Sequence, residues 1–401
     1  MVTEAEQRAV GRTGKQSVRY ALWISLATGI GYLPFALTIP LLPEHVTGRL
    51  NGGPAQVGSV VSSYAVTSLL VRPVSGALMN RLGARALTVG GAVLTTLATV
   101  CCAWAGSITQ LMLLWLLVGV GIGVMQAATG VWPVQLVAED RQSWALGLAG
   151  TVNYLALGIG APLGTLIARL VGTANAFVVA GLITLLVVPI ACCVPEVRVP
   201  PKGERPGAGR GRALLGTALP STALVFTALG FAAVTSFAVA KYDELGVPGG
   251  AAVVTAYSLT VVVLRIASTW IRWEATRPAT LAALFLVEAA GIALIGVSDG
   301  LVVGVIGGVL TGVGMWQIYP ALGVFVVRSV SERQRPAALS VFGACFTVGV
   351  AAGSGSLGVV AQAFGYEAMF GVCAACVVVG MLVAVAASRM PAPAAGQQRT
   401  S

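Results

Sequence analysis

The sequence at the junction of two long apolar segments, about 55–79 and 86–105, reads Gly76-Ala77-Leu78-Met79-Asn80-Arg81-Leu82-Gly83-Ala84-Arg85. Glycine in such a connection lets the ends of two neighbouring helices approach closely. Arginine side chains beside it interact with the partial negative charge of a helix C-terminus. The stretch therefore predicts a tight, basic connection between two antiparallel helices.

Apolar segments recur along the whole chain. Hydrophobic residues make up 57% of the 401 residues and charged residues only 9%, a composition typical of proteins that cross a bilayer. About 20 helical residues cross the roughly 30 Å of hydrocarbon, and the segments lack the alternation of a membrane barrel. We therefore predict an all-α integral membrane protein with twelve transmembrane helices, at about 20–42, 55–79, 86–105, 108–134, 144–168, 174–194, 217–239, 250–272, 278–297, 301–327, 337–361 and 366–388.

The chain also repeats itself. At a constant offset of 193 residues, unlike residue types fall into register: Tyr64 with Tyr257, Arg72 with Arg265, Gly119 with Gly312, Gly121 with Gly314, Glu139 with Glu332, Gly172 with Gly365 and Phe177 with Phe370. Internal repetition of this kind is common in transporters, which build a substrate path between two halves. We expect a six-helix bundle over 1–194, a Pro-, Gly- and charge-rich cytoplasmic linker over 195–216, and a second six-helix bundle with a short tail over 217–401.

The net charge of +10 has a membrane explanation rather than a nucleic-acid one. With the N-terminus placed in the cytoplasm, nearly all Lys and Arg residues fall in cytoplasmic loops, and those left outside are Arg49, Arg169 and Lys241. The positive-inside rule therefore predicts that both termini are cytoplasmic.

Several classes of function have no support in the sequence. The seven cysteines all lie within spans, and His45 is the single histidine, so no set of metal ligands is present. We find no phosphate-binding loop for ATP and no nucleophile–base pair in the spans. We therefore expect no enzyme activity, no cofactor and no metal; any energy for transport comes from a gradient.

The stretch 76–85 resembles the loop G-x-L-a-D-R-x-G-R-[RK] of the major facilitator superfamily. Gly76, Leu78, Arg81, Gly83 and Arg85 match, whereas Asn80 and Ala84 depart from the usual Asp and Arg. The resemblance covers twelve spans, a central linker, the duplication and a degenerate second copy of the loop that begins near Arg265, with Thr269 and Trp273 in place of Gly76 and Asn80. It implies alternating access, with the gating loop formed by Gly76, Asn80, Arg81, Gly83 and Arg85.

A second motif is similar to that of drug exporters in the same superfamily. It reads Gly158-Ile159-Gly160-Ala161-Pro162-Leu163-Gly164, and Gly158, Gly160, Pro162 and Gly164 would form a helix-packing motif. The resemblance implies a monomeric plasma-membrane exporter of a drug or secondary metabolite, working by proton antiport. Trp115 stands where such exporters carry an arginine; together with Asn80 it favours an uptake permease or an uncoupled facilitator as the alternative. A non-transporting receptor on the same scaffold is a further alternative.

Three charged residues stand out inside the predicted spans, away from the span ends: Arg72, Arg265 and Glu288. Charges inside a bilayer cost several kcal/mol unless they are paired or wetted. Arg265 and Glu288 fall at similar depths on neighbouring helices, so they form either a static ion pair or a proton-coupling pair. Arg72 either extends toward the cytoplasm or faces the substrate.

In this family the first, fourth, seventh and tenth spans line the cavity. Polar and aromatic residues on them, with two on the fifth span and one on the eighth, are the substrate-cavity candidates; the alternative for each is helix packing. They would bury an amphipathic small molecule by area, with amides fixing its orientation. The candidates are Tyr32, Phe35, Gln126, Asn153, Tyr154, Thr235, Phe237, Tyr257, Trp316, Gln317 and Tyr319.

Overall fold

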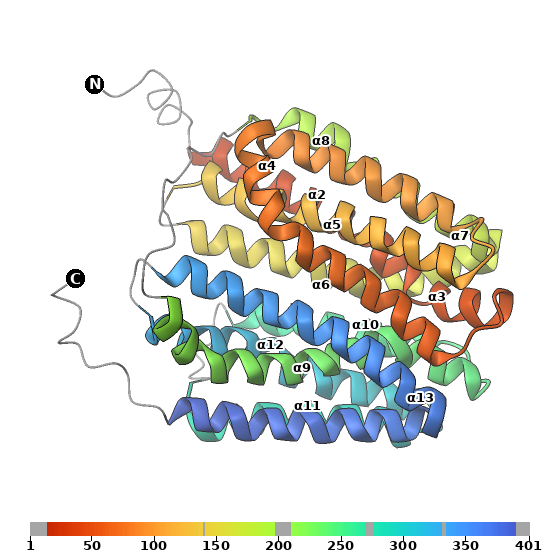
Figure 1. The fold of residues 1–401 in the computed structure, drawn as a ribbon. Coiled ribbons are helices and arrows are strands. Elements are labelled where there is room, and N and C mark those ends of the chain that lie inside the picture. The colour runs from red at the N-terminus through yellow and green to blue at the C-terminus, as the bar shows by residue number, and fades with distance from the viewer. Residues whose placement is uncertain (1–13, 139–140, 197–209, 269–275, 331–333, 390–401) are drawn as a thin grey trace, which may run out of the picture.

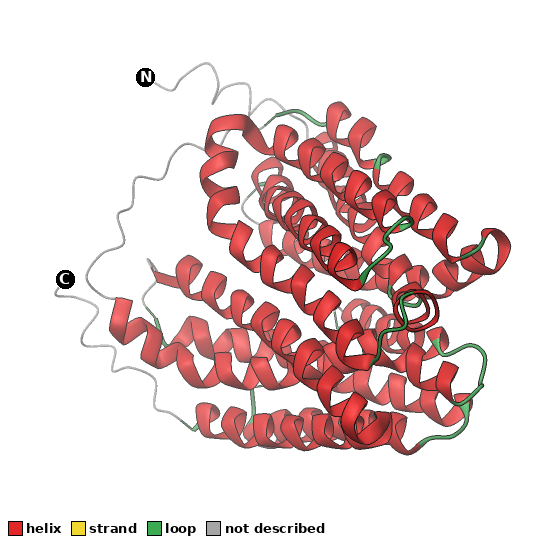
Figure 2. Cartoon of the chain, turned by 45° about the vertical axis from the view of Figure 1, so that its right-hand side comes forward, coloured by secondary structure: helices red, strands yellow, loops and turns green. Residues whose placement is uncertain are grey.

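The computed structural model describes residues 14–138, 141–196, 210–268, 276–330 and 334–389. Within these ranges the chain is helical and carries no strand (Figure 2). The α-helices, with a short π-helix η1 at His45–Arg49, are α2 (Gly14–Thr38), α3 (Leu41–Glu44), α4 (Pro54–Cys102), α5 (Ile108–Leu136), α6 (Gln142–Val171), α7 (Thr173–Thr184), α8 (Val187–Cys193), α9 (Arg210–Glu244), α10 (Ala251–Ala267), α11 (Pro278–Val297), α12 (Leu301–Arg328) and α13 (Arg335–Ser388).

Two of these helices are each a pair of antiparallel spans. Gly83 interrupts α4 with φ 86° and ψ 165°, and Gly365 interrupts α13 with φ 82° and ψ 168°. Such backbone angles are open to glycine because it has no Cβ. The described residues contain nine helices long and apolar enough to cross a membrane, including α4 and α13, and the shorter apolar helix α10. When α4 and α13 are divided at their glycines, these helices give the twelve predicted spans.

The repeat in the sequence is also a repeat in structure. Gly172, which separates α6 from α7, has φ 85° and ψ 155°, close to the angles of its repeat partner Gly365. Gly119 packs against the backbone of Tyr64, and its partner Gly312 packs in the same way against Tyr257. The chain therefore consists of two related halves, α2–α8 and α9–α13, which lie one above the other in Figure 1.

The connection at 76–85 is shorter than predicted. The helix continues to residue 82 and resumes at 84, so only Gly83 leaves the helical conformation. The first helix of the second half, α9, begins at Arg210, within the segment predicted to be the linker. Most of the second copy of the loop, with Thr269 and Trp273, lies outside the described residues, as do Glu139, Glu332 and residues 197–209.

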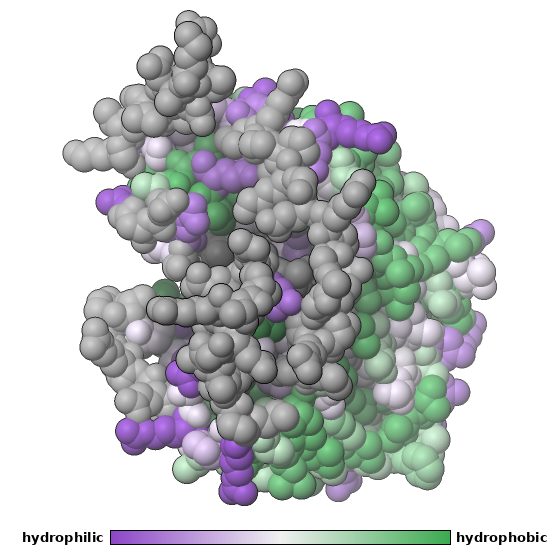
Figure 3. All heavy atoms as spheres, turned by 60° about the vertical axis from the view of Figure 1, so that its left-hand side comes forward, coloured by the Kyte–Doolittle hydropathy of each residue, from purple (hydrophilic) through white to green (hydrophobic). Residues whose placement is uncertain are grey.

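The molecule has two distinct ends. We call the end at which α2 begins and α13 finishes the terminal side, and the opposite end the far side (Figure 1). Figure 3 is turned toward the terminal side: among the described residues, hydrophilic ones are visible on that face and hydrophobic ones cover the flank. An apolar flank with a polar end is expected for a bundle of membrane-spanning helices.

Candidate functional site

Arg72 reaches from the first half to the second near the middle of the bundle. It lies eleven residues before the turn at Gly83, so roughly 16 Å from the terminal end of its helix. Its Nη2 donates a hydrogen bond to Thr347 Oγ1 of α13, 3.1 Å away, and its guanidinium lies beside Gly343. Arg72 is exposed although it faces the other half, so open space separates the halves at this depth.

Arg265 makes the reverse crossing, from α10 of the second half to α6 of the first. Its guanidinium carbon lies 6.0 Å from the ring centroid of Tyr154, and its Nη1 lies against Gly150. A cation over an aromatic ring at this distance is attracted by the ring's negative face.

The two crossings are related by the repeat. The offset of 193 residues that relates Arg72 to Arg265 also relates Gly150 to Gly343 and Tyr154 to Thr347. Arg72 therefore contacts Gly343 and Thr347, and Arg265 makes the repeat-related contacts with Gly150 and Tyr154. Sequence reasoning missed Thr347, although applying the repeat to Tyr154 would have pointed to it.

A line of aromatic rings runs between the two arginines. The rings of Tyr154 and Tyr257 lie 6.3 Å apart, Tyr257 and Phe231 6.3 Å, Phe231 and Phe346 5.5 Å, and Phe346 and Tyr319 6.0 Å. Tyr319 is within electrostatic reach of both arginines. The structure therefore brings together Tyr154, Tyr257 and Tyr319 from the predicted cavity, together with Phe231 and Phe346, which no sequence pattern singled out; of these, Tyr257 and Phe231 are buried behind the others.

Three predicted cavity residues lie in the packed interior instead. Phe35 is 2% exposed and stacks on Tyr64 at 4.6 Å. Thr235 is 2% exposed and bonds to the Phe231 carbonyl of its own helix, and Phe237 is fully buried beside Tyr366. These side chains point into their own halves, so in this conformation they pack helices and do not line the path.

The other candidates are less constrained. Tyr32 is partly buried next to Phe35, with ring centroids 5.1 Å apart. Gln126 Nε2 and Asn153 Oδ1 are buried without a hydrogen-bond partner. A buried amide without a partner is costly, so these groups suit a ligand or water. Trp316 is buried and Gln317 is partly buried on α12.

Glu288 of α11 is completely buried inside the second half. Thr227 of α9 donates a hydrogen bond to its Oε2 at 2.5 Å, while Oε1 lies against Gly230 and has no partner. The expected pair with Arg265 is not formed: between described residues the ion pair is Arg85 with Glu196. The reason is that Arg265 turns toward the first half, whereas Glu288 turns into its own half.

The two halves meet tightly on the far side. Ser62 donates to the Ala351 carbonyl at 2.6 Å, and Thr255 donates to the Gly158 carbonyl at 2.9 Å. Within the motif at 158–164, Gly158 faces α10 of the other half, while Gly160 and Gly164 face the backbone of α2. On the terminal side, by contrast, Gly76 and Gly147 have no atom within 4 Å of the place where a Cβ would lie.

Comparison with known proteins identifies the family. The model of the Major Facilitator Superfamily matches residues 24–271 and 221–401. The chain belongs to this superfamily. It is 28% identical over 325 residues to an MFS-type transporter, YhhS, of Escherichia coli strain K12, covering 78% of each chain. Membership in this superfamily makes it a transporter and not an enzyme.

Solved structures of the superfamily share its fold. A bacterial homologue of the human lysosomal transporter Spinster, in an inward-facing and unoccupied conformation, has a TM-score of 0.77 at 14% identity over 94% of this chain and 98% of that one. The nucleoside transporter NupG has a TM-score of 0.73 at 13% identity over 93% and 100%. At such identities the likeness concerns the fold alone.

At the superfamily's loop between the second and third spans, the carboxylate comes from outside the loop in this protein. Asn80 lacks the usual carboxylate, but Glu196, which follows α8, sits against Gly83. Its Oε1 accepts from the Arg85 backbone N–H at 3.2 Å, and its Oε2 lies 3.6 Å from Arg85 Nε. Arg81 is exposed. Among the described residues, the contacts of this turn are therefore made within its own half.

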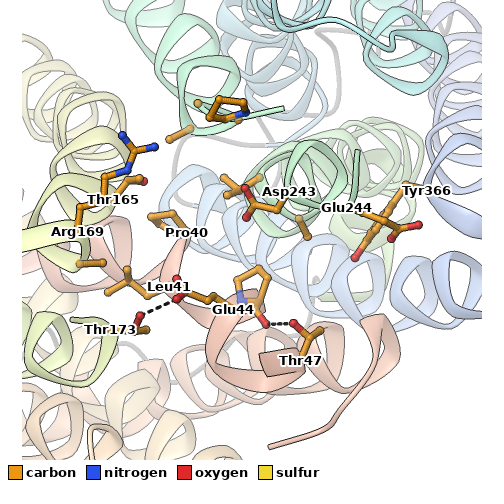
Figure 4. A pocket seen from close by; sticks show the side chains of 18 residues that line it. Pro40, Leu41, Glu44, Thr47, Thr165, Arg169, Thr173, Asp243, Glu244 and Tyr366 are labelled. Carbon is orange, nitrogen blue, oxygen red and sulfur yellow. Dashed lines mark hydrogen bonds between the residues drawn. The ribbon is translucent and has the colours of Figure 1, made fainter. Parts of the chain in front are cut away.

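A cavity of about 700 Å³ opens between the halves on the far side (Figure 4). Glu44, Asp243 and Glu244 line it together with Arg169, and Thr173 donates to Glu44 at 2.9 Å. The closed contacts of Ser62 and Thr255 lie deeper in the bundle. No group of three or more His, Cys, Asp or Glu among the described residues is arranged to hold a metal ion.

Proposed function

We propose that this superfamily member is a monomeric plasma-membrane transporter that exports a small amphipathic compound in exchange for protons. The basic residues support an orientation with the terminal side, and both termini, in the cytoplasm. On the terminal side lie Arg81, Arg85, Arg141, Arg328, Arg335 and Arg389; on the far side lie Arg49, Arg169 and Lys241.

With that orientation, the conformation described above is open to the cytoplasm. The far-side contacts of Ser62 and Thr255 close the path to the outside, and the exposed Arg72 reaches across the gap on the cytoplasmic side of them. A path that is open on one side and closed on the other is what alternating access requires. In this state an exporter would take up its substrate.

The observation that carries proton coupling is the burial of Glu288 without a cation. An ionised carboxylate in such a place costs several kcal/mol, whereas a neutral carboxylic acid bonded to Thr227 costs far less. Glu288 contacts α9 and lies beside Gly314 of α12, two helices that line the path in this family. Binding and release of a proton at Glu288 would therefore favour different arrangements of these helices.

Inverted membrane vesicles test this function. We expect a transported compound to accumulate inside them, to leak out when an uncoupler collapses the proton gradient, and to accumulate much less with Glu288→Gln at equal expression. The matched control is Thr95→Val, because Thr95 occupies the repeat position of Glu288 and its hydroxyl has no partner.

The competing function is uncoupled facilitation, which Trp115 favours. This residue is 2% exposed and packs against Phe35 and Tyr64 at ring distances of 6.2 and 6.3 Å, so no cation occupies the position where proton-coupled exporters carry one. Flux that equilibrates across the vesicle membrane and ignores the uncoupler would establish facilitation and exclude antiport.

A further inference from the structure

We propose that Arg72 and Arg265 together bind the negatively charged group of the substrate, which is an amphipathic organic anion such as an aromatic or aliphatic carboxylate. This inference rests on the proposed transport function and names its substrate class. It arises from the pairing of two cations across the gap between the halves.

Both arginines carry a charge that no described carboxylate balances. Neither arginine forms an ion pair with a described carboxylate: Arg72 has the hydroxyl of Thr347, and Arg265 has the ring face of Tyr154. A hydroxyl and a ring face leave most of the five N–H donors of a guanidinium available. Because cations within a span are costly unless paired or wetted, two of them facing one gap form a strong site for an anion.

The positions of the two arginines favour a shared anion. The arginines come from opposite halves and cross to repeat-related contacts, and both act electrostatically on Tyr319. An anion near Tyr319 would therefore be attracted from both halves at once. Glu288 does not compete for either cation, because it is buried within the second half and bonded to Thr227.

The rest of the substrate would meet aromatic side chains. The rings of Tyr154, Phe346 and Tyr319 lie between the arginines and offer an apolar and aromatic surface. Such a surface buries the body of a molecule whose charged group the arginines hold. A compact inorganic anion would leave this surface unused, so the structure favours an organic anion.

The charge also fits the direction of transport. A cell interior is electrically negative, and moving one charge through 100 mV changes its free energy by about 2.3 kcal/mol. An anion leaving the cytoplasm moves with this potential, so the membrane potential assists export and opposes uptake.

Equilibrium binding of matched acids and amides to the purified full-length protein in detergent tests the site. The probes are 1-naphthoate, 4-phenylbutyrate and indole-3-acetate, each beside its neutral primary amide, with empty micelles subtracted. We expect at least one acid to bind saturably and about tenfold or more tightly than its amide. Loss of a charge-assisted contact in Arg72→Gln or Arg265→Gln should weaken that binding roughly 10- to 100-fold.

Two controls keep the result interpretable. Arg72→Lys and Arg265→Lys keep the charge and should retain more binding than the Gln variants, and Arg169→Gln in the far-side cavity should bind like the wild type. Either of two results would overturn the anion site. In the first, the amides bind as tightly as their acids. In the second, no acid binds saturably to the wild type, or every acid that does so binds equally well to the Arg72→Gln/Arg265→Gln double variant. Uptake of the same probes into inverted vesicles is measured separately. If amides and acids are transported alike, the protein is a transporter but the anion site is wrong. If the acids bind but are not transported, the anion site holds but the export function is wrong.

Discussion

The two halves carry matching arginines, but among the described residues only one carboxylate, Glu288, is buried. Arg72 and Arg265 are repeat partners with equivalent contacts, whereas Glu288 corresponds to Thr95 and its hydrogen-bond partner Thr227 corresponds to Pro34. Gly121 packs on Thr95 just as Gly314 packs on Glu288, so the two sites share their geometry and differ in their chemistry. Features shared by the halves face the gap between them, and the unshared carboxylate lies inside one half. This difference suggests that substrate binding is divided between the halves while proton binding belongs to the second.

The largest effect is expected from forcing apart the far-side contact between α4 and α13. A side chain at Gly58 would collide with the Ser354 carbonyl, whereas Gly76 on the same helix has open space. Overpacking costs about 1–3 kcal/mol, so Gly58→Leu should shift the equilibrium between states roughly 5- to 150-fold and reduce transport. The measurement is labelling of an added Ser62→Cys by a membrane-impermeant maleimide, with Gly76→Leu as control. Equal labelling in both variants would show that this contact does not close the path.

A smaller effect is expected at Lys241, whose repeat-related position in the first half is a glycine, Gly48. Its buried Nζ donates to the carbonyls of Ile295, Gly296 and Ser298 at the end of α11, while the repeat-related Gly48 has no neighbour within 4 Å of a Cβ position. Bonds from a charged donor stabilise by roughly 1.5–3 kcal/mol, so Lys241→Met should lower the melting temperature in detergent. Gly48→Ala should not. An unchanged melting temperature for Lys241→Met would mean that the cap is dispensable.

Thr227→Val sharpens the comparison at the carboxylate. It removes the hydrogen bond to Glu288 Oε2 and makes the site more like that of the first half. Loss of such a bond costs roughly 1–3 kcal/mol, so uncoupler-sensitive accumulation should fall about fivefold or more, while Thr227→Ser should restore it. If Val and Ser behave alike, the hydroxyl has no part in coupling.

The smallest effect is expected at the turn of the first half. The Arg85–Glu196 pair is partly exposed, with side chains 38% and 30% accessible, and such pairs contribute about 0–1 kcal/mol. Glu196→Gln should therefore change the melting temperature little and transport less than twofold, as measured in inverted vesicles. A large loss of transport would instead show that this carboxylate serves as the acid of the gating loop, in place of Asn80.

The sequence was sufficient to predict the fold and the repeat, because apolar length and residue register report directly on membrane spans. It also singled out Arg72 and Arg265 as charges within spans and Tyr154 as a cavity candidate, without placing either arginine at the gap between the halves. It misplaced the partner of Arg265, because helix depth does not say which face of a helix a residue occupies. Thr235 and Phe237 lie on a path-lining helix but face its core side. Glu196 lies beyond the reach of motif reasoning, because its contact with Gly83 depends on how the end of α8 folds back.

Comparing exchange with uphill transport in the Glu288→Gln variant tests the division between substrate binding and proton binding most directly. In vesicles preloaded with unlabelled substrate, the account predicts that this variant exchanges labelled substrate at close to the wild-type rate but fails to accumulate it against a gradient. Arg265→Gln should lose both activities. Full uphill accumulation by Glu288→Gln, or loss of exchange together with accumulation, would contradict the assignment of proton binding to Glu288.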